Sequence, residues 1–213
     1  MIEPKRLDKS EIFWNKVSKR FGNSKRTMNS PALQSIRQNA GNYFKPIDTV
    51  LDFGCGPGDI TFEIARQTQQ VYATDISEGM IEAAKQKADE QNISNIQFIK
   101  TNLFDVNFQT NSLDVITAFN VLHYIKIKKQ LYAKFHELLK PQGFFISSTA
   151  CLRERKSALR FLMSGLTTLK IVPETLFYKT SELENEIEEA GFTIVEASYI
   201  AKLPERFIIA RKV

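Results

Sequence analysis

The chain has 213 residues, of which 43% are hydrophobic and 25% are charged, with 29 Lys and Arg against 24 Asp and Glu. This balance is typical of one soluble globular domain, and it excludes a disordered chain or two enzyme domains with separate cores. The apolar stretches are much shorter than the roughly 20 residues that cross a bilayer, and the first residues are charged, so we expect neither a membrane span nor secretion.

The two cysteines and the charge distribution indicate the cellular compartment and the kinds of ligand or partner. Cys55 and Cys151 lie far apart and match no zinc-ligand spacing, so they predict neither a disulfide framework nor a metal site and favour a reducing cytoplasm. The net charge of +5 is concentrated in residues 1–28, which hold eight basic and three acidic residues, while the remainder holds 21 of each. Such a segment can meet an acidic ligand, an anionic membrane surface or nucleic acid, or can form a solvated helix face.

Two helices are predicted at the start of the chain. Residues 9–21 carry apolar side chains on one helix face, with Trp14 beside them, which predicts an amphipathic helix. This helix either docks on the core or closes as a lid over an apolar ligand. Ser30 and Pro31 suit an N-cap and a first helical position, so a second helix is expected from Ser30 to about Tyr43. Residues 1–45 are therefore expected to form a helical N-terminal cap.

Short apolar runs alternate with amphipathic segments between residues 46 and 149. Strands are predicted at 49–53, 71–74, 96–99, 113–119 and 144–148. Helices are predicted at 59–67, 78–91 and 128–139. Parallel strands need a crossover, which is normally a right-handed helix, so the alternation predicts an α/β fold with a parallel sheet and helices on both faces.

The alternation breaks after the fifth predicted strand. Residues 150–179 hold six basic and two acidic residues and are expected to form an insertion over one end of the sheet. Residues 181–184 read as a capping box, which predicts a helix that ends at Gly191. Two further strands are predicted at 192–199 and 206–210. All 213 residues are expected to form a single domain, with residues 180–213 as its C-terminal helix and strands.

The strongest local signal is Asp52-Phe53-Gly54-Cys55-Gly56-Pro57-Gly58, where a predicted strand turns into a predicted helix. Glycines let the backbone approach a ligand closely, and the first amides of the next helix can donate hydrogen bonds to it. The spacing differs from the Gly-x-Gly-x-x-Gly fingerprint of dinucleotide sites, because Asp59 stands where that fingerprint has its third glycine. The carboxylate of Asp52 suits a cationic ligand better than a pyrophosphate, which it would repel.

A second acidic residue, Asp75, ends the next predicted strand, 17 positions after Gly58. Ligands of open parallel sheets bind at the carboxyl ends of the strands, where a carboxylate can accept hydrogen bonds from both hydroxyls of a ribose. The glycine turn and Asp75 together predict a site for a nucleoside that is joined to a positively charged group and carries no diphosphate.

These residues resemble the class I S-adenosylmethionine-dependent methyltransferases. Residues 52–58 match the family's Asp/Glu-x-Gly-x-Gly-x-Gly at all four specified positions, and Asp75 matches the acidic residue that ends its second strand. The likeness covers about residues 49–149, extends more loosely to the C-terminus, and is greatest to small-molecule methyltransferases such as those of quinone biosynthesis. It implies a Rossmann-like, doubly wound, seven-stranded and mostly parallel sheet with an antiparallel last strand, with the N-terminal helices as a lid.

The resemblance also implies a cofactor, S-adenosylmethionine, and the residues that bind it. These are Asp52, Gly54, Cys55, Gly56, Gly58, Asp75, Ile76, Met80, Asn102, Leu103, Asn120 and Val121. Asp52 would lie near the ammonium of the methionine portion, and Asp75 would hold the ribose. Ile76 and Met80 would pack on the adenine. Asn102 stands where the family often has an Asp, and its amide oxygen can still accept from the adenine amino group.

His123 and Tyr124 are the candidate catalytic residues that the resemblance implies, at the point where methyl donor and acceptor meet. His123 is the leading candidate for a general base if the acceptor must lose a proton. The acceptor is expected to be a small molecule, apolar or anionic, with residues 150–179 as the acceptor-side insertion. Purely structural roles stay open for several of these residues, including Asp52, Cys55 and His123.

Other functions stay open as well. A nicotinamide-dependent oxidoreductase has the same alternating architecture, although the glycine spacing and Asp52 count against it. A nucleic-acid (RNA) methyltransferase, or a non-catalytic binder of the same cofactor, would dock through the basic residues of 1–28 and 150–179. The sequence after the fourth strand, Asn120-Val121-Leu122-His123, lacks the Asn/Asp-Pro-Pro-Tyr/Phe signature of many amino-directed nucleic-acid methyltransferases and favours a small acceptor.

Overall fold

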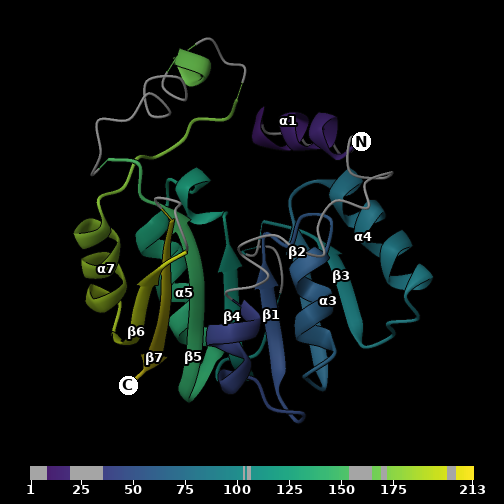
Figure 1. Cartoon of the computed structure of the whole chain (residues 1–213), viewed down its shortest axis with the longest axis horizontal. Helices are drawn as coiled ribbons and strands as arrows, with labels where there is room; N and C mark the ends of the chain where they lie inside the picture. Colours follow the sequence, from purple (N-terminus) through teal and green to yellow (C-terminus); the bar gives the residue numbers. More distant parts are fainter. Residues whose placement is uncertain are drawn as a thin grey trace.

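A computed structural model of the chain describes residues 9–19, 36–102, 104, 107–153, 165–168, 172–200 and 205–213. Seven strands form one sheet in the order β3-β2-β1-β4-β5-β7-β6 (Figure 1). The strands are β1 (Thr49–Phe53), β2 (Gln70–Asp75), β3 (Ile96–Lys100), β4 (Leu113–Phe119), β5 (Leu139–Ala150), β6 (Phe192–Tyr199) and β7 (Glu205–Lys212). Strand β7 pairs antiparallel with β5 and β6, and the other pairs are parallel. The expected sheet with an antiparallel last strand is confirmed.

Helices cover both faces of this sheet. They are α1 (Lys9–Ser18), α3 (Asp59–Ala65), α4 (Glu78–Glu90), α5 (Lys128–Leu138) and α7 (Thr180–Glu189), with the short helices η1 (Ile36–Ala40), η2 (Gly41–Tyr43) and η3 (Leu122–Tyr124). Neighbouring residues of a strand point to opposite faces. In β4, Val115 packs in a cluster with residues of α3 and η1, and Ile116 packs in a cluster with residues of α5 and α7. This confirms the expected doubly wound arrangement.

The predicted helix from Ser30 to about Tyr43 is described only in part, and the predicted helix near residue 181 begins at a different residue. Residues 20–35, which include Ser30 and Pro31 of the predicted second helix, lie outside the described residues, and η1 and η2 account for the part that is described. Helix α7 begins at Thr180 with Lys179 as its N-cap, so the predicted capping box at 181–184 is wrong in register. The Glu182 carboxylate reaches back to accept from the Lys179 backbone amide at 3.1 Å, which makes Glu182 the third helical residue.

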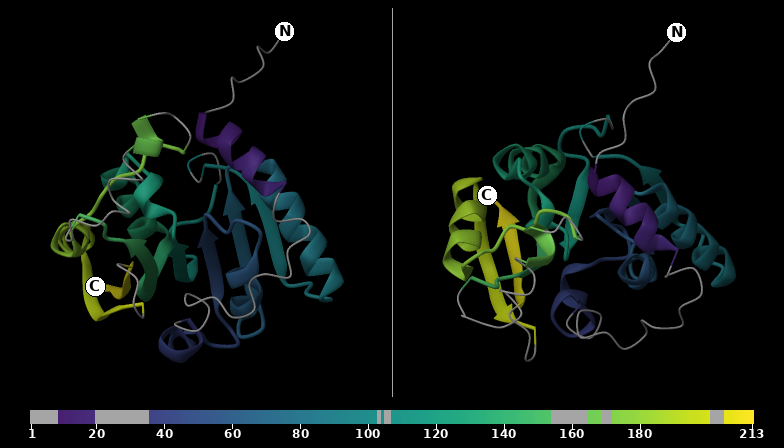
Figure 2. Two further views of the ribbon diagram at one scale, coloured as in Figure 1. Left: turned by 45° about the horizontal axis from the view of Figure 1, so that its top comes forward. Right: turned by 90° about the horizontal axis from the view of Figure 1, so that it is seen from above.

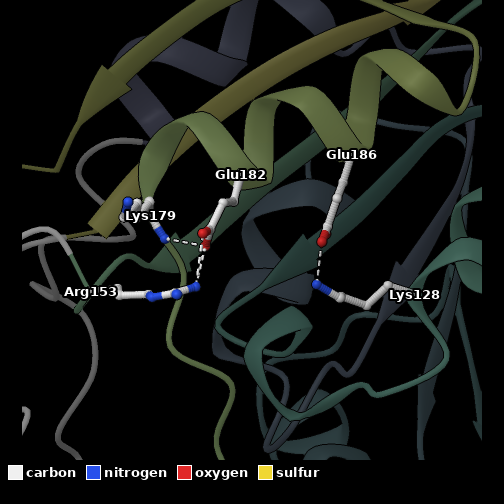
Figure 3. A network of polar contacts seen from close by, with 5 residues as sticks. All are labelled: Lys128, Arg153, Lys179, Glu182 and Glu186. Carbon is white, nitrogen blue, oxygen red and sulfur yellow. Dashed lines mark hydrogen bonds and ion pairs between the residues drawn. The ribbon is translucent and has the colours of Figure 1, made fainter.

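The chain leaves and rejoins the core of the fold at neighbouring points around residues 150–179. The Arg153 backbone amide donates to the Tyr178 carbonyl oxygen at 2.9 Å. The Arg153 guanidinium also pairs with Glu182 of α7 at 2.8 Å, and Lys128 of α5 pairs with Glu186 of the same helix (Figure 3). The two contacts of Arg153 hold both ends of the predicted insertion beside α7, and the Lys128–Glu186 pair holds α5 against α7. Residues 154–164 and 169–171 of the insertion lie outside the described residues.

Candidate cofactor and active site

Left-handed backbone builds the turn after β1. Gly54, Gly56 and Gly58 have φ angles of 73°, 54° and 84°, which glycine adopts without strain. A Cβ on Gly54 would lie 2.5 Å from Val121 Cγ2, and a Cβ on Gly58 would lie 2.7 Å from the Phe62 ring. A Cβ on Gly56 would meet nothing within 4 Å. Gly54 and Gly58 therefore permit close packing of the protein on itself, whereas the turn is open on the side of Gly56.

The amides of this turn are already used within the protein. The amides of Gly54 and Cys55 donate to the Thr74 carbonyl oxygen at 2.8 and 3.0 Å. The amide of Gly56 donates to Asp75 Oδ2 at 3.0 Å. A turn that cradles a pyrophosphate presents such amides to the phosphate oxygens. The turn therefore does not suit a dinucleotide, and the nicotinamide-dependent alternative loses its support.

Asp75 ends β2 with both carboxylate oxygens held in place. Oδ2 accepts from the amide of Gly56, and Oδ1 accepts from the amide of Ser77 at 2.8 Å. Burial raises the pKa of the Asp75 carboxyl, and the hydrogen bonds from Ser77 and Gly56 oppose that rise. A carboxylate oxygen can accept more than one hydrogen bond. The fixed carboxylate of Asp75 can therefore accept from two ribose hydroxyls while it stays bonded to the backbone, as a nucleoside cofactor requires.

Asp52 is buried beneath the turn, with 2% of its surface exposed. Its Oδ2 accepts from the Thr61 hydroxyl of α3 at 2.6 Å, and its Oδ1 accepts from the Thr117 hydroxyl of β4 at 2.8 Å. Burial raises the pKa of Asp52 to about 6, against the opposing effect of these two hydrogen bonds. The structure thus gives Asp52 a role in joining β1, α3 and β4, and its contact with the cofactor ammonium stays a prediction.

The segment after β4 brings the candidate catalytic residues to the same edge of the sheet. Asn120 has a φ of 54°, Val121 lies against Gly54, and η3 follows with His123 and Tyr124. His123 is 7% exposed, and its Nδ1 has no hydrogen-bond partner among the described residues. Burial lowers the pKa of His123 to about 4 and raises the pKa of Tyr124. The two rings lie 4.1 Å apart between centroids.

Helix α1 lies over the carboxyl ends of the strands, at the same end of the molecule as the helical turn of residues 165–168 (Figures 1 and 2). The Trp14 ring meets the Tyr124 ring nearly at right angles, with the centroids 5.2 Å apart. On the other side of the edge, Asn15 Oδ1 accepts from the Ser77 hydroxyl at 2.7 Å and from the Gly79 amide at 3.2 Å. Helix α1 thus bridges the loops that follow β2 and β4, so docking on the core and covering the site are one arrangement.

The remaining predicted residues differ in how they relate to the site. Cys55 is buried and packs with Ala73 and Ile81, and burial raises the pKa of its thiol. Met80 is buried in α4, while Ile76 is half-buried beside Asp75. Asn102 Oδ1 accepts from the Phe104 amide at 3.0 Å, and Leu103 lies outside the described residues. Contacts of Ile76, Met80, Asn102 and Leu103 with an adenine stay predictions.

Sequence reasoning missed two polar residues at this edge. Asn15 holds α1 on the loop after β2, and Glu205 accepts a hydrogen bond from the Asn120 side chain at 2.9 Å. Both contacts join residues that are distant in the sequence, and no local motif marks either residue. In the part of the chain that the structure describes, no helix has the length and apolarity needed to cross a bilayer.

Comparisons with known proteins agree with this geometry. A family described as "Methyltransferase domain" matches residues 45–192, which is more than half of the chain. A 2-phytyl-1,4-naphtoquinone methyltransferase from Nostoc sp. is 36% identical over 103 residues, which cover 46% of this chain and 45% of that protein. A ubiquinone biosynthesis O-methyltransferase from Acinetobacter baumannii is 26% identical over 153 residues, which cover 69% and 64% of the two chains. The matched region thus spans about half to two thirds of these curated relatives.

Solved structures show the same fold. A SAM-dependent methyltransferase from Aquifex aeolicus aligns with a TM-score of 0.72 at 18% identity, over 93% of this chain and 98% of that one. A geranyl diphosphate C-methyltransferase from Streptomyces coelicolor, solved with S-adenosyl-L-homocysteine, aligns with a TM-score of 0.72 at 13% identity, over 99% of each chain. At these identities the structural likeness establishes the fold, and the family match establishes the relationship. The chain belongs to the class I S-adenosylmethionine-dependent methyltransferase family.

Proposed function

We propose that the protein transfers a methyl group from S-adenosylmethionine to a small, largely apolar acceptor. The cofactor supplies a sulfonium-bound methyl group that is already activated for attack by a nucleophile. The observation that carries the proposal is the contact between the Gly56 amide and Asp75 Oδ2, 3.0 Å apart. It holds the open side of the glycine turn next to a carboxylate that can accept from a ribose, and it leaves no free turn amide there for a diphosphate.

The binding roles follow from position along the edge of the sheet. Gly54, Gly56 and Gly58 would line the methionine portion, and Asp75 would hold the ribose. Asn120 and Val121 would lie beside the methionine portion from the β4 side, because Val121 abuts Gly54. The field of the buried Asp52 would favour the cofactor's ammonium and sulfonium charges. The protein's main contribution to rate is then to align the acceptor behind the methyl carbon.

Aromatic side chains of α1 and η3 meet at the proposed acceptor side. The Trp14 and Tyr124 rings meet edge to face there, and the buried His123 is neutral at pH 7 because its pKa is about 4. Rings of this kind suit a flat apolar molecule. The relatives from Nostoc and Acinetobacter are named for quinone substrates. We therefore place the acceptor among small apolar molecules with a quinone-like or phenolic ring.

His123 would act on such an acceptor through its imidazole. In the neutral ring one nitrogen carries the proton, and the other can accept a hydrogen bond from an acceptor hydroxyl. Its low pKa makes the imidazole a weak base, so it matches an acidic hydroxyl such as a phenol better than an alcohol. Tyr124, whose ring packs against His123 at a tilt of 47°, would hold the imidazole and one face of the acceptor.

Location and further contacts are part of the same proposal. Cys55 and Cys151 are buried cysteines, and buried thiols suit a reducing compartment such as the cytoplasm. The basic residues of 1–28 would approach an anionic surface or an acidic ligand. Of that segment only residues 9–19 are described, and there Glu11 pairs with Lys100 at 2.8 Å.

Calorimetric titration with S-adenosylmethionine and with NAD tests the cofactor assignment, and transfer of labelled methyl to phenolic quinone precursors or to RNA tests the acceptor. We expect S-adenosylmethionine alone to bind, and Asp75→Ala to weaken binding by about 1 to 3 kcal/mol through loss of charge-assisted hydrogen bonds. Asp59→Ala is the matched control, because this acidic residue adjoins Gly58 but pairs with Lys87 of α4 at 3.1 Å. Equal losses in the two variants, or binding of NAD, would contradict the proposal.

A further inference from the structure

A buried carboxylate from the last strand reaches the segment that follows β4. Glu205 begins β7 and is 8% exposed. Asn120 Nδ2 donates to Glu205 Oε1 at 2.9 Å, and the Ser148 hydroxyl of β5 donates to the same oxygen. Within the described ranges, these two hydrogen bonds are the polar contacts of the carboxylate. An acidic residue therefore links three strands at the carboxyl edge of the sheet.

The topology explains how residues 120 and 205 meet. Strand β5 lies between β4 and β7, and β7 runs antiparallel to it. The first residue of β7 pairs with the last residue of β5, Ala150, so β7 begins where the parallel strands end. The Asn120 amide also donates to the Ser148 carbonyl oxygen at 2.9 Å. Asn120 is thus held from its backbone by β5 and from its side chain by β7.

Asn120 has a left-handed backbone, which decides where the next residues go. Its φ is 54°, a conformation that Asn tolerates better than most residues when its side chain has a partner. Val121 follows immediately against Gly54, and a Cβ on Gly54 would lie only 2.5 Å from it. His123 and Tyr124 come next in η3. A change in the backbone at Asn120 would therefore move Val121, which lies against the glycine turn, and both candidate catalytic residues.

We propose that Glu205 is a positioning residue for methyl transfer, which acts through Asn120 on Val121, His123 and Tyr124. The inference rests on the proposed function, because these residues are the ones that would meet cofactor and acceptor. Burying a carboxylate is costly unless it is hydrogen-bonded, and a bond from an amide to a charged acceptor is stronger and more directional than a neutral one. Glu205 thus fixes one geometry of the bend at Asn120.

The test exchanges the hydrogen-bond donor and acceptor between Asn120 and Glu205. Asn120→Asp places a second carboxylate against Glu205, and we expect kcat to fall more than the affinity for S-adenosylmethionine. The double variant Asn120→Asp with Glu205→Gln restores an amide-to-carboxylate bond with donor and acceptor exchanged, and we expect it to recover most of the lost kcat. Glu205→Ala should lower kcat by about 10- to 100-fold, as expected for the loss of a hydrogen bond to a charged group.

Ser148→Ala is the matched control. It removes the other hydrogen bond to Glu205 Oε1 and leaves Asn120 Nδ2 bonded to the carboxylate, so its loss of kcat should be smaller than that of Glu205→Ala. Thermal unfolding of each variant separates altered geometry from lost folding. If Glu205→Ala does not fold, the Asn120→Asp variant and the exchanged pair carry the test.

An NMR measurement distinguishes a failure of the positioning role of Glu205 from a failure of the proposed methyl transfer. The side-chain amide protons of Asn120 should show a resonance in NMR spectra that shifts in Glu205→Ala and stays in place in Ser148→Ala. No transfer by the wild type would refute the proposed function and leave this resonance to report on the contact. An active wild type with unchanged kcat in Glu205→Ala, or no recovery in the exchanged pair, would overturn the positioning role.

Discussion

The buried carboxylate of Asp52 makes the stability of the protein depend on pH in a direction opposite to that of a salt-bridged acid. Burial raises the pKa of Asp52 from its ordinary value of 3.8 to about 6 in the folded protein. The folded state therefore binds a proton more tightly than the unfolded state does. The stabilisation is complete below pH 3.8 and is lost as the pH rises through about 6. Asn at this position stays neutral at every pH and removes this dependence.

The size of the effect follows from the two pKa values. At 1.36 kcal/mol for each pH unit, a rise from 3.8 to about 6 corresponds to about 3 kcal/mol over the whole range. On the order of 1 kcal/mol of that change falls between about pH 5 and about pH 7, where urea unfolding is practical. We expect the free energy of unfolding of the wild type, relative to Asp52→Asn, to fall by this amount between these two pH values.

The assay is urea unfolding, followed by circular dichroism, of both proteins at each pH. Thr117→Val supplies an internal check, because the Thr117 hydroxyl donates to Asp52 Oδ1 and opposes the rise in the Asp52 pKa. Without this donor the pKa should rise further, and the pH window should move upward. A difference between wild type and Asp52→Asn that is flat in pH, or that grows as the pH rises, would refute the reasoning.

Three further predictions concern the glycine turn, helix α1 and the imidazole of His123. Gly58→Ala should destabilise the fold by about 1 to 3 kcal/mol, because its φ is 84° and the new Cβ would lie 2.7 Å from Phe62. Gly56→Ala strains the backbone at its φ of 54° but meets no atom within 4 Å, so it should lower the free energy of unfolding less than Gly58→Ala does and should weaken cofactor binding in calorimetry; a larger loss of stability than in Gly58→Ala would contradict an open side at Gly56. Trp14→Ala should raise the KM for the acceptor, while Trp14→Phe keeps a ring against Tyr124 and should retain most of the affinity. Equal kinetics for both variants would show that the Trp14 ring does not contact the acceptor. His123→Ala should lower kcat, and wild-type kcat/KM should show no inflection from this histidine between about pH 5.5 and pH 8, because its pKa is about 4; an inflection near pH 6.5 that His123→Ala abolishes would count against the buried, neutral imidazole.

Local sequence patterns predicted the parts of the fold that depend on interactions between residues close in the sequence. The predicted strands at 49–53 and 113–119 match β1 and β4 at both ends, because each is an apolar run with a clear turn at its carboxyl end. Strand β5 extends from Leu139 to Ala150, well beyond the predicted 144–148, since its first residues include Pro141 and Gly143, which lower strand propensity. There the pairing with β4, which shifts register between Leu113 and Val115, overrides propensity.

The orientation of Asp52 could have been predicted from the sequence. Residues 50 and 52 of a strand share a face, and Val50 is fully buried with α3. Period-2 alternation therefore directs Asp52 toward the face of the sheet that α3 covers, as the hydrogen bond with Thr61 shows. The motif singled out Asp52, but a motif carries no information about which side of the strand the carboxylate occupies.

The two halves of the site are built differently, and this difference has a functional consequence. The proposed cofactor half consists of β1, the glycine turn and the end of β2, which are close in sequence and joined by backbone hydrogen bonds such as that from Gly54 to Thr74. The proposed acceptor half joins elements that are distant in sequence through single side-chain contacts: Trp14 of α1 meets η3, Glu205 of β7 holds Asn120, and Asn15 holds α1 on the loop after β2. Substitutions in α1 or β7 can therefore reshape the proposed acceptor half while the backbone of the glycine turn keeps its geometry. Changes of acceptor specificity should arise at Trp14, Asn15 and Glu205 before they arise in the glycine turn.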